Sequence, residues 1–180
     1  MDLPALNITA DFFSLLNLSQ RQALDIAQLE TNFRDLQARV HPDRHVRASA
    51  ADQRLAMQWA SRVNEAFQTL REPLRRANYL LSLKGYDTGL ESNTAMPVAF
   101  LMAQLELREG VAEAREAGDE AALGQFRDDI AAEMKSEFAQ LETLIDEQAD
   151  FPVASNLVRQ LMFQQKLLSE IDDALVAVVD

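Results

Sequence analysis

Three consecutive residues, His41, Pro42 and Asp43, hold most of the chain's potential for chemistry. His41 could exchange a proton or ligate a metal ion, and Asp43 could orient it or bind a cation. A second histidine, His45, follows closely, and these two are the only histidines of the sequence. The tripeptide therefore admits three interpretations: a catalytic or metal site, a simple helix-ending turn, or a rigid loop that a partner protein recognises.

The rest of the sequence does not complete a metal or catalytic site. The chain has no cysteine, and Pro42 prevents His41 and His45 from sharing one continuous helix face. Two imidazoles without a third placed ligand make a poor zinc site. A catalytic histidine would need a nucleophile and an orienting group beside it, and the local pattern supplies no such pair. We expect no metal, no cofactor and no catalytic residue. The alternative from a different class of function is an enzyme that uses His41.

Two amphipathic helical patterns flank the tripeptide. Pro42 lacks an N–H and disfavours helical geometry at His41, so the first helix should end near Val40. Asp25, three residues before Gln28, is typical of a helix N-cap. The two apolar faces should pack as an antiparallel hairpin with the tripeptide at its exposed tip. The faces are formed by Ile26, Leu29, Phe33, Leu36 and Val40, and by Leu55, Trp59, Val63, Phe67 and Leu70.

The charge of the chain changes sign along its length. Residues 1–84 hold 11 Lys and Arg against 9 Asp and Glu, whereas residues 85–180 hold 6 against 20. This asymmetry predicts two modules with different partners, and the acidic second module would repel nucleic acid. Single exposed arginines are ordinary, but four near the tripeptide form a basic patch that favours an acidic partner surface. The four are Arg34, Arg39, Arg44 and Arg47.

The first module resembles a J domain, the part of co-chaperones that stimulates DnaK-type ATPases. The resemblance is carried by DFFSLLNL at 11–18, HPDR at 41–44 and VNEAFQTL at 63–70. The continuation LREPLRRANYLL at 70–81 is similar to one subfamily, the HscB-type co-chaperones of iron–sulfur cluster assembly. Val40 and His45 depart from the aromatic residues usual there. The resemblance implies that the ATPase HscA contacts His41, Pro42, Asp43, Arg34, Arg39 and Arg44.

Three long helical patterns make up the second module. They cover about 95–117, 119–145 and 151–178, with Gly118 at the first connection and Pro152 after the second. Such patterns with short connections predict an antiparallel three-helix bundle. In the third pattern we expect Gln164 on the outer face. The expected core stripes are Phe100, Ala103, Leu107, Val111 and Ala114 in the first pattern, and Leu157, Leu161, Leu168, Ile171, Leu175 and Val178 in the third.

The first helix of the bundle carries more apolar surface than its core stripe requires. Three large apolar residues lie outside that stripe, and a row of glutamates continues in the same direction. Like charges at this spacing do not stabilise a helix, whereas an apolar patch with an acidic border suits a basic, partly apolar partner. The alternatives are a solvated acidic face and a contact with the first module. The residues are Leu101, Met102, Leu105, Glu106, Glu109 and Glu113.

The stretch FLMAQLELRE at 100–109 resembles the helix by which HscB-type co-chaperones bind the cluster scaffold protein IscU. Phe163, which helical spacing places outside the core of the third helix, matches a further position of that site. Ala103 and Gly110 depart from the usual glutamates, and Gly110 should weaken the helix by about 1 kcal/mol relative to alanine. The implied scaffold contacts are Leu101, Met102, Leu105, Glu106, Glu109, Glu113 and Phe163.

The sequence thus predicts an all-α, L-shaped protein with a J domain at 1–84, a linker at 85–94 and a three-helix scaffold-binding domain at 95–180. The resemblance implies a co-chaperone that stimulates HscA and delivers IscU to it. A general J-protein with varied clients and a purely structural helical adaptor are the alternatives. Because no apolar run approaches about 20 residues and no signal peptide is evident, we expect a cytoplasmic protein without membrane contact. Residues 1–10 have no assigned role.

Overall fold

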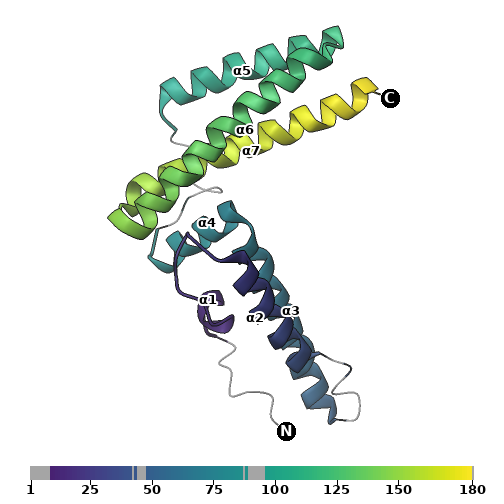
Figure 1. Cartoon of the computed structure of the whole chain (residues 1–180), viewed down its shortest axis with the longest axis vertical. Coiled ribbons are helices and arrows are strands. Elements are labelled where there is room, and N and C mark those ends of the chain that lie inside the picture. Colours follow the sequence, from purple (N-terminus) through teal and green to yellow (C-terminus); the bar gives the residue numbers. More distant parts are fainter. Residues whose placement is uncertain (1–8, 42, 44–47, 87, 89–95, 180) are drawn as a thin grey trace. The chain divides into compact units, whose positions relative to one another are not determined.

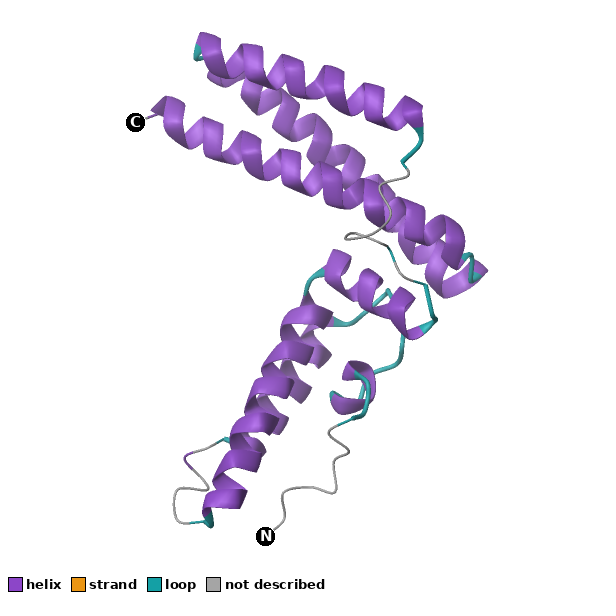
Figure 2. Cartoon of the chain, turned by 180° about the vertical axis from the view of Figure 1, so that it is seen from behind, coloured by secondary structure: helices purple, strands orange, loops and turns teal. Residues whose placement is uncertain are grey.

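The computed structural model describes residues 9–41, 43, 48–86, 88 and 96–179, and every regular element in these ranges is a helix (Figure 1). Figure 2 shows the same helices from behind. The backbone divides into two compact units, Met1–Leu80 and Leu81–Asp180. The linker expected at 85–94 lies mostly outside the described residues, so the domain limits at 84 and 95 stay predictions. Within the described ranges, no helix is both long and apolar enough to cross a membrane.

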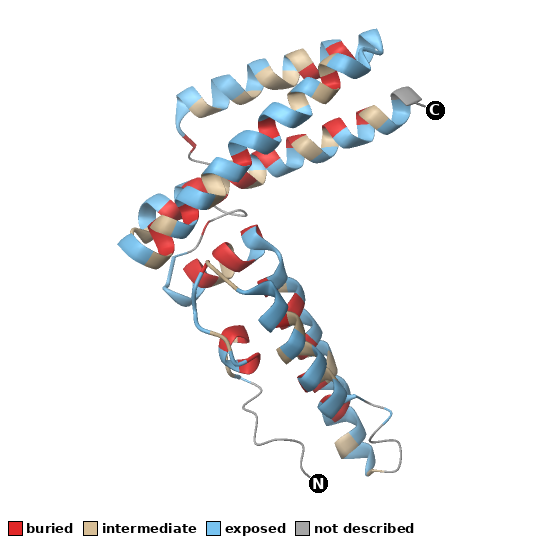
Figure 3. Cartoon of the chain, viewed as in Figure 1, coloured by how far each residue is buried: buried red, intermediate tan, exposed pale blue. Residues whose placement is uncertain are grey.

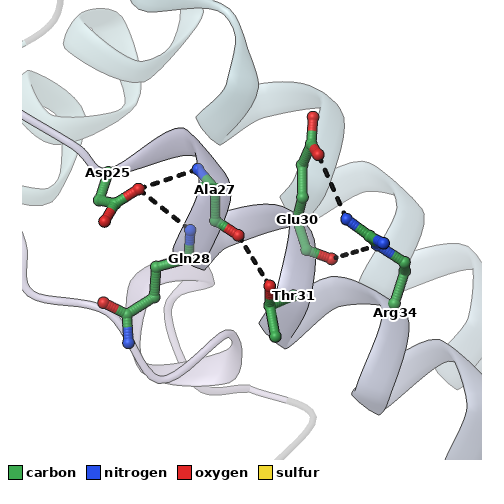
Figure 4. Close-up of polar contacts among 6 residues, drawn as sticks. All are labelled: Asp25, Ala27, Gln28, Glu30, Thr31 and Arg34. Carbon is green, nitrogen blue, oxygen red and sulfur yellow. Dashed lines mark hydrogen bonds and ion pairs between the residues drawn. The ribbon is translucent and has the colours of Figure 1, made fainter.

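The first unit is built on a hairpin of α2 (Ile26–Val40) and α3 (Ala50–Arg71). The Asp25 carboxylate caps α2 by accepting hydrogen bonds from the backbone N–H groups of Ala27 and Gln28, at 2.9 and 3.1 Å (Figure 4). Two orphan donors of the first turn are thereby satisfied. The helix ends at Val40, and His41 has extended backbone angles, as the proline after it predicts.

The facing sides of α2 and α3 form the core of the hairpin (Figure 3). The rings of Phe33 and Phe67 stack with centroids 4.1 Å apart. Most of the predicted apolar positions are buried, and Val40 and Val63 have no exposed surface. Ile26 and Leu55 were wrongly assigned to the core, since both are more than a third exposed. Each lies in the first part of its helix, where the partner helix does not cover it fully.

Two short helices complete this unit. They are α1 (Phe12–Leu15) and the part of α4 (Pro73–Leu83) up to Leu80, and α4 begins at the proline predicted to start it. The Tyr79 ring stacks on the Phe12 ring with centroids 4.4 Å apart, and the Tyr79 hydroxyl accepts a 2.9 Å hydrogen bond from the Phe12 N–H. The Arg62 guanidinium lies 4.9 Å from the centre of the same Phe12 ring. Aromatic and cationic contacts therefore fix α1 to α3 and α4.

The second unit is a three-helix bundle of α5 (Val98–Ala117), α6 (Glu120–Thr143) and α7 (Phe151–Val179). Gly118 ends α5 with a φ of 65°, the left-handed cap that its position predicted. The Asp119 carboxylate then caps α6 by accepting from the Ala122 N–H at 2.9 Å. A π-helical turn, η2 (Leu144–Gln148), follows α6 and was not expected from the sequence.

The core of α7 differs from the predicted stripe. Leu167 is 1% exposed, whereas Leu168, expected inside, is only half-buried. Gln164 is 2% exposed, although it was expected on the outer face. The predicted stripe contained only apolar residues and therefore missed this glutamine. Its side-chain amide forms a hydrogen bond with the Glu137 carboxylate of α6. In α5, Ala103 was wrongly assigned to the core and is exposed.

Gly110 has a packing role that its low helix propensity did not predict. A Cβ at this position would lie 2.9 Å from Cζ of Phe126, closer than side-chain atoms approach. The missing side chain therefore makes room for the Phe126 ring between α5 and α6. Gly124 in α6 is a matched contrast, because an added Cβ there would meet nothing within 4 Å.

We predict opposite outcomes for alanine at these two glycines. Gly124→Ala should raise the free energy of unfolding by about 0.5–1 kcal/mol, since only the backbone propensity changes. Gly110→Ala should gain less than this or lose stability, because the Phe126 ring must move. Urea denaturation of both variants measures the difference. Equal gains at the two sites would show that Phe126 does not need the space.

A second prediction concerns the half-buried carboxyl of Glu137. Burial raises the pKa of Glu137, the nearby Glu133 carboxylate raises it further, and the hydrogen bond with Gln164 opposes both effects. The neutral form therefore stabilises the fold at low pH, and this stabilisation is lost as the pH rises through the folded-state pKa. Glu137→Gln should raise the melting temperature at pH 7, with a gain that shrinks below pH 4.3, about the ordinary glutamate pKa.

Thermal unfolding of Glu137→Gln from about pH 3.5 to about pH 8, a range that brackets the ordinary glutamate pKa, tests this directly. Glu142→Gln removes the same charge from an exposed position of α6 and serves as the control. A gain of equal size in both variants would mean that net charge, not the environment of Glu137, causes it.

Candidate functional site

The residues singled out by the sequence form two surfaces, one on each unit. On the first unit, the chain leaves α2 at Val40 and passes through His41 and Asp43, which we call the tip. The Asp43 N–H donates a 3.2 Å hydrogen bond to Nδ1 of the His41 ring. An Asp43 carboxylate oxygen lies 3.6 Å from the same nitrogen. The imidazole thus braces the backbone that carries the aspartate.

The tip displays its carboxylate to solvent. The Asp43 side chain is 85% exposed and the His41 side chain 51% exposed. Because the brace uses the backbone N–H of Asp43, the carboxylate can accept hydrogen bonds from a partner. A carboxylate whose own backbone N–H is held by the His41 ring suits a bidentate contact with an arginine. Among the described residues, no three His, Asp or Glu side chains are grouped so that they could hold a metal ion.

The predicted arginines of this surface fall on α2 and on the loop after it. Arg34 is exposed and pairs with Glu30 one turn away at 3.4 Å (Figure 4). Such an exposed pair contributes little and can exchange for a partner's carboxylate. Arg39 is exposed and borders a depression of about 320 Å³ beside α1. Pro42 and Arg44, like His45 and Arg47, lie outside the described residues.

The second surface lies on the outer side of α5 and is called the α5 face. Its apolar residues Leu101, Met102 and Leu105 are 42, 53 and 51% exposed. Phe163 of α7 is 37% exposed, and its ring meets the Phe100 ring edge to face with centroids 6.1 Å apart. The bundle therefore brings an aromatic residue of α7 next to the start of α5, far from it in the sequence.

An acidic row borders these apolar residues. Glu106, Glu109 and Glu113 are all exposed. Within the described part of the chain, none of the three forms an ion pair, so their charges are free to meet a basic partner. The α5 face, defined by Leu101, Met102, Leu105, Glu106, Glu109, Glu113 and Phe163, is thus contiguous along α5 and extends to α7.

One pair of charged residues near this face escaped the sequence analysis. The Arg108 guanidinium on α5 lies 3.0 Å from a carboxylate oxygen of Glu170 on α7. Arg108 follows Leu105 by three residues and so continues the apolar row along the same side of the helix. The position of Arg108 on α5 follows from the sequence. Its pairing with Glu170 became evident only from the packing of α5 against α7.

Comparisons with known proteins agree on one family. A family model described as the HSCB C-terminal oligomerisation domain matches residues 96–172. The Co-chaperone protein HscB homolog of Aromatoleum aromaticum is 49% identical over 173 residues, which cover 96% of this chain and 98% of that protein. The resemblance stated from the tripeptide and the α5 sequence is therefore confirmed at the level of the family.

Solved structures extend the agreement to the fold. The chaperone HscB from Vibrio cholerae superposes with a TM-score of 0.80 at 39% identity, covering 91% of this chain and 96% of that one. The human co-chaperone protein HscB gives a TM-score of 0.88 at 29% identity, covering 94% and 84%. The predicted all-α fold, a J domain followed by a helical bundle, is confirmed.

Proposed function

The chain belongs to the HscB family of co-chaperones, and from this premise we propose that it stimulates the ATPase of an HscA-type chaperone and delivers the scaffold protein IscU to it. Its relatives are named co-chaperones, not enzymes, and no reaction is assigned to its own side chains. The observation that carries the proposal is the exposed Asp43 carboxylate, on a residue whose backbone N–H donates to the His41 ring.

Asp43 would act as an acceptor for an arginine of the chaperone. A charge-assisted, bidentate contact of this kind is among the stronger polar interactions, and it depends on geometry. The bond from the Asp43 N–H to His41 holds the backbone in place before the partner arrives, which lowers the entropy cost of docking. Arg34, Arg39 and Arg44 would add attraction for an acidic chaperone surface.

The α5 face would bind IscU. Leu101, Met102 and Leu105, together with Phe163, offer exposed apolar surface whose burial against a partner is favourable by about 25 cal/mol per Å². The acids Glu106, Glu109 and Glu113 would pair with basic groups at the edge of the contact. Such a rim adds specificity and association rate more than affinity.

Because both surfaces lie on one chain, binding of the scaffold protein and binding of the chaperone would be coupled. A scaffold protein held on α5 is kept near the chaperone held at the tip, at an effective concentration on the order of millimolar for a short connection. ATP hydrolysis and capture of the scaffold would then coincide. The iron–sulfur cluster is cargo of the scaffold in this proposal and is not a cofactor of the chain.

One prediction tests the role of the tip in ATPase stimulation independently of IscU binding. Asp43→Ala should reduce stimulation of HscA turnover by about thirtyfold or more, the size expected when one partner of a docked charge pair is removed. His41→Gln removes the imidazole that holds the Asp43 N–H and should also reduce stimulation. Binding of IscU by the same variants should stay unchanged.

The matched control is Glu72→Ala, which removes one exposed acidic charge at the opposite end of the hairpin. It should stimulate like the unmodified chain. Normal stimulation by Asp43→Ala would refute the role assigned to the tip.

A separate prediction concerns IscU binding at the α5 face. Leu105→Ser combined with Phe163→Ser should weaken IscU binding at least tenfold, because each buried apolar side chain is worth about 1.5–3 kcal/mol. Circular dichroism should show the same helix content, with a melting temperature lowered only by the loss of the contact between the Phe163 and Phe100 rings. Isothermal titration calorimetry measures the affinity.

Val153→Ser combined with Val176→Ser removes two exposed apolar side chains of α7 outside the α5 face and is the control. Its affinity should match that of the unmodified chain. Full affinity in the Leu105 and Phe163 variant would mean that IscU binds elsewhere.

A further inference from the structure

A groove of about 510 Å³ runs between α5 and α7 beyond the α5 face. Its floor is apolar and well packed: Val111, Leu167 and Ala174 are each less than a tenth exposed. Ala112, on its edge, is exposed and has only a methyl side chain. The groove is therefore hollow because small residues stand where larger ones would close it.

Two arginines lie along this groove in different states. Arg108 is paired with Glu170 across the groove at 3.0 Å. Arg115, two turns further along α5, is exposed, and within the described ranges its side chain has neither an ion pair nor a hydrogen bond. An unpaired guanidinium beside an apolar hollow is suited to a carboxylate on whatever fills the hollow.

The groove continues the α5 face without a break. On α5, Leu101, Leu105, Arg108, Ala112 and Arg115 follow one another at intervals of four, three, four and three residues, which places them in one row. On α7, Phe163 is followed at the same kind of interval by Leu167, Glu170 and Ala174, the other wall of the groove. A partner on the α5 face would therefore meet the groove as it extends along the helices.

The acids of the α5 face lie to one side of this row, and the row itself carries Arg108 and Arg115. At about 100° per residue, the acids Glu106, Glu109 and Glu113 lie roughly 80–140° from Leu101 in one direction, whereas Arg108 and Arg115 lie roughly 20–40° from it in the other. A partner would present basic groups to these acids and an acidic group to Arg115, the arginine of the groove that is not paired with Glu170, while Glu116 also lines the groove. This uneven distribution of charge favours one orientation of the partner across α5.

We propose that the α5–α7 groove is a second contact for the scaffold protein, taking one of its aliphatic side chains against the floor of Val111, Leu167 and Ala174 while Arg115 pairs with a neighbouring carboxylate of that protein. The inference rests on the proposed function, because its occupant is the partner assigned there. It adds the chemistry of a second anchor and a means of fixing the partner's orientation.

Two variants test the groove. Ala112→Trp fills it from an exposed position, and Arg115→Glu reverses the unpaired charge. Each should lower the affinity for IscU about tenfold or more, the factor that corresponds to roughly 1.4 kcal/mol. Ala132→Trp and Lys135→Glu make the same changes at exposed positions of α6 outside the groove, and both should bind within about twofold of the unmodified chain, as surface changes away from a contact do.

Leu105→Ser, measured in the same titration, separates this inference from the proposed function. If Leu105→Ser loses affinity while both groove variants bind normally, the groove is not a contact and the inference is overturned, but the α5 face stands. If Leu105→Ser also binds normally, the assignment of the α5 face itself fails. Should Ala112→Trp lower the melting temperature, Arg115→Glu with its Lys135→Glu control decides alone.

Sedimentation equilibrium of the same variants tests another occupant. If the unmodified chain self-associates and Ala112→Trp abolishes this without changing IscU affinity, a second copy of the chain fills the groove and the inference is overturned. An unchanged oligomeric state together with reduced IscU affinity supports it.

Discussion

The packing of α2 against α3 is the constraint on which the position of the tip depends. Val40, the last residue of α2, is fully buried, so the helix is fixed up to the point where the chain leaves it. The chain therefore leaves α2 from a fixed point, and the hydrogen bond from the Asp43 N–H ties Asp43 to the ring of His41, the first residue beyond the helix. A carboxylate that is 85% exposed is thereby held in place, although nothing covers it.

In the second unit, the bundle packs only one side of α5. Val111 and Ala114 are buried on that side, whereas Leu101 and Leu105 are left exposed on the outer one. Exposed apolar residues do not help a chain to stay monomeric, and like charges along α5 do not stabilise it. These features have no evident structural benefit, so a binding role for the α5 face explains them more simply.

Local chemistry was predictable from the sequence, and contacts between distant residues were not. The end of α2 at Val40 and the cap at Gly118 follow from proline and glycine stereochemistry within a few residues. The burial of Gln164 could not be predicted from a pattern of apolar residues, because its hydrogen-bond partner Glu137 lies on another helix. Helical spacing could place the residues of the α5 face on one side, but the pairing of Arg108 with Glu170 and the groove beside it required the positions of two helices.

We propose that one chain binds a chaperone and its scaffold client at separate surfaces and so couples them. HscA turnover measured with this chain alone, with IscU alone and with both tests it most directly. If the two surfaces act together, the stimulation with both proteins should exceed the product of the separate stimulations, because the chain concentrates IscU at the ATPase. Stimulation that merely multiplies or adds the two separate effects would contradict the account.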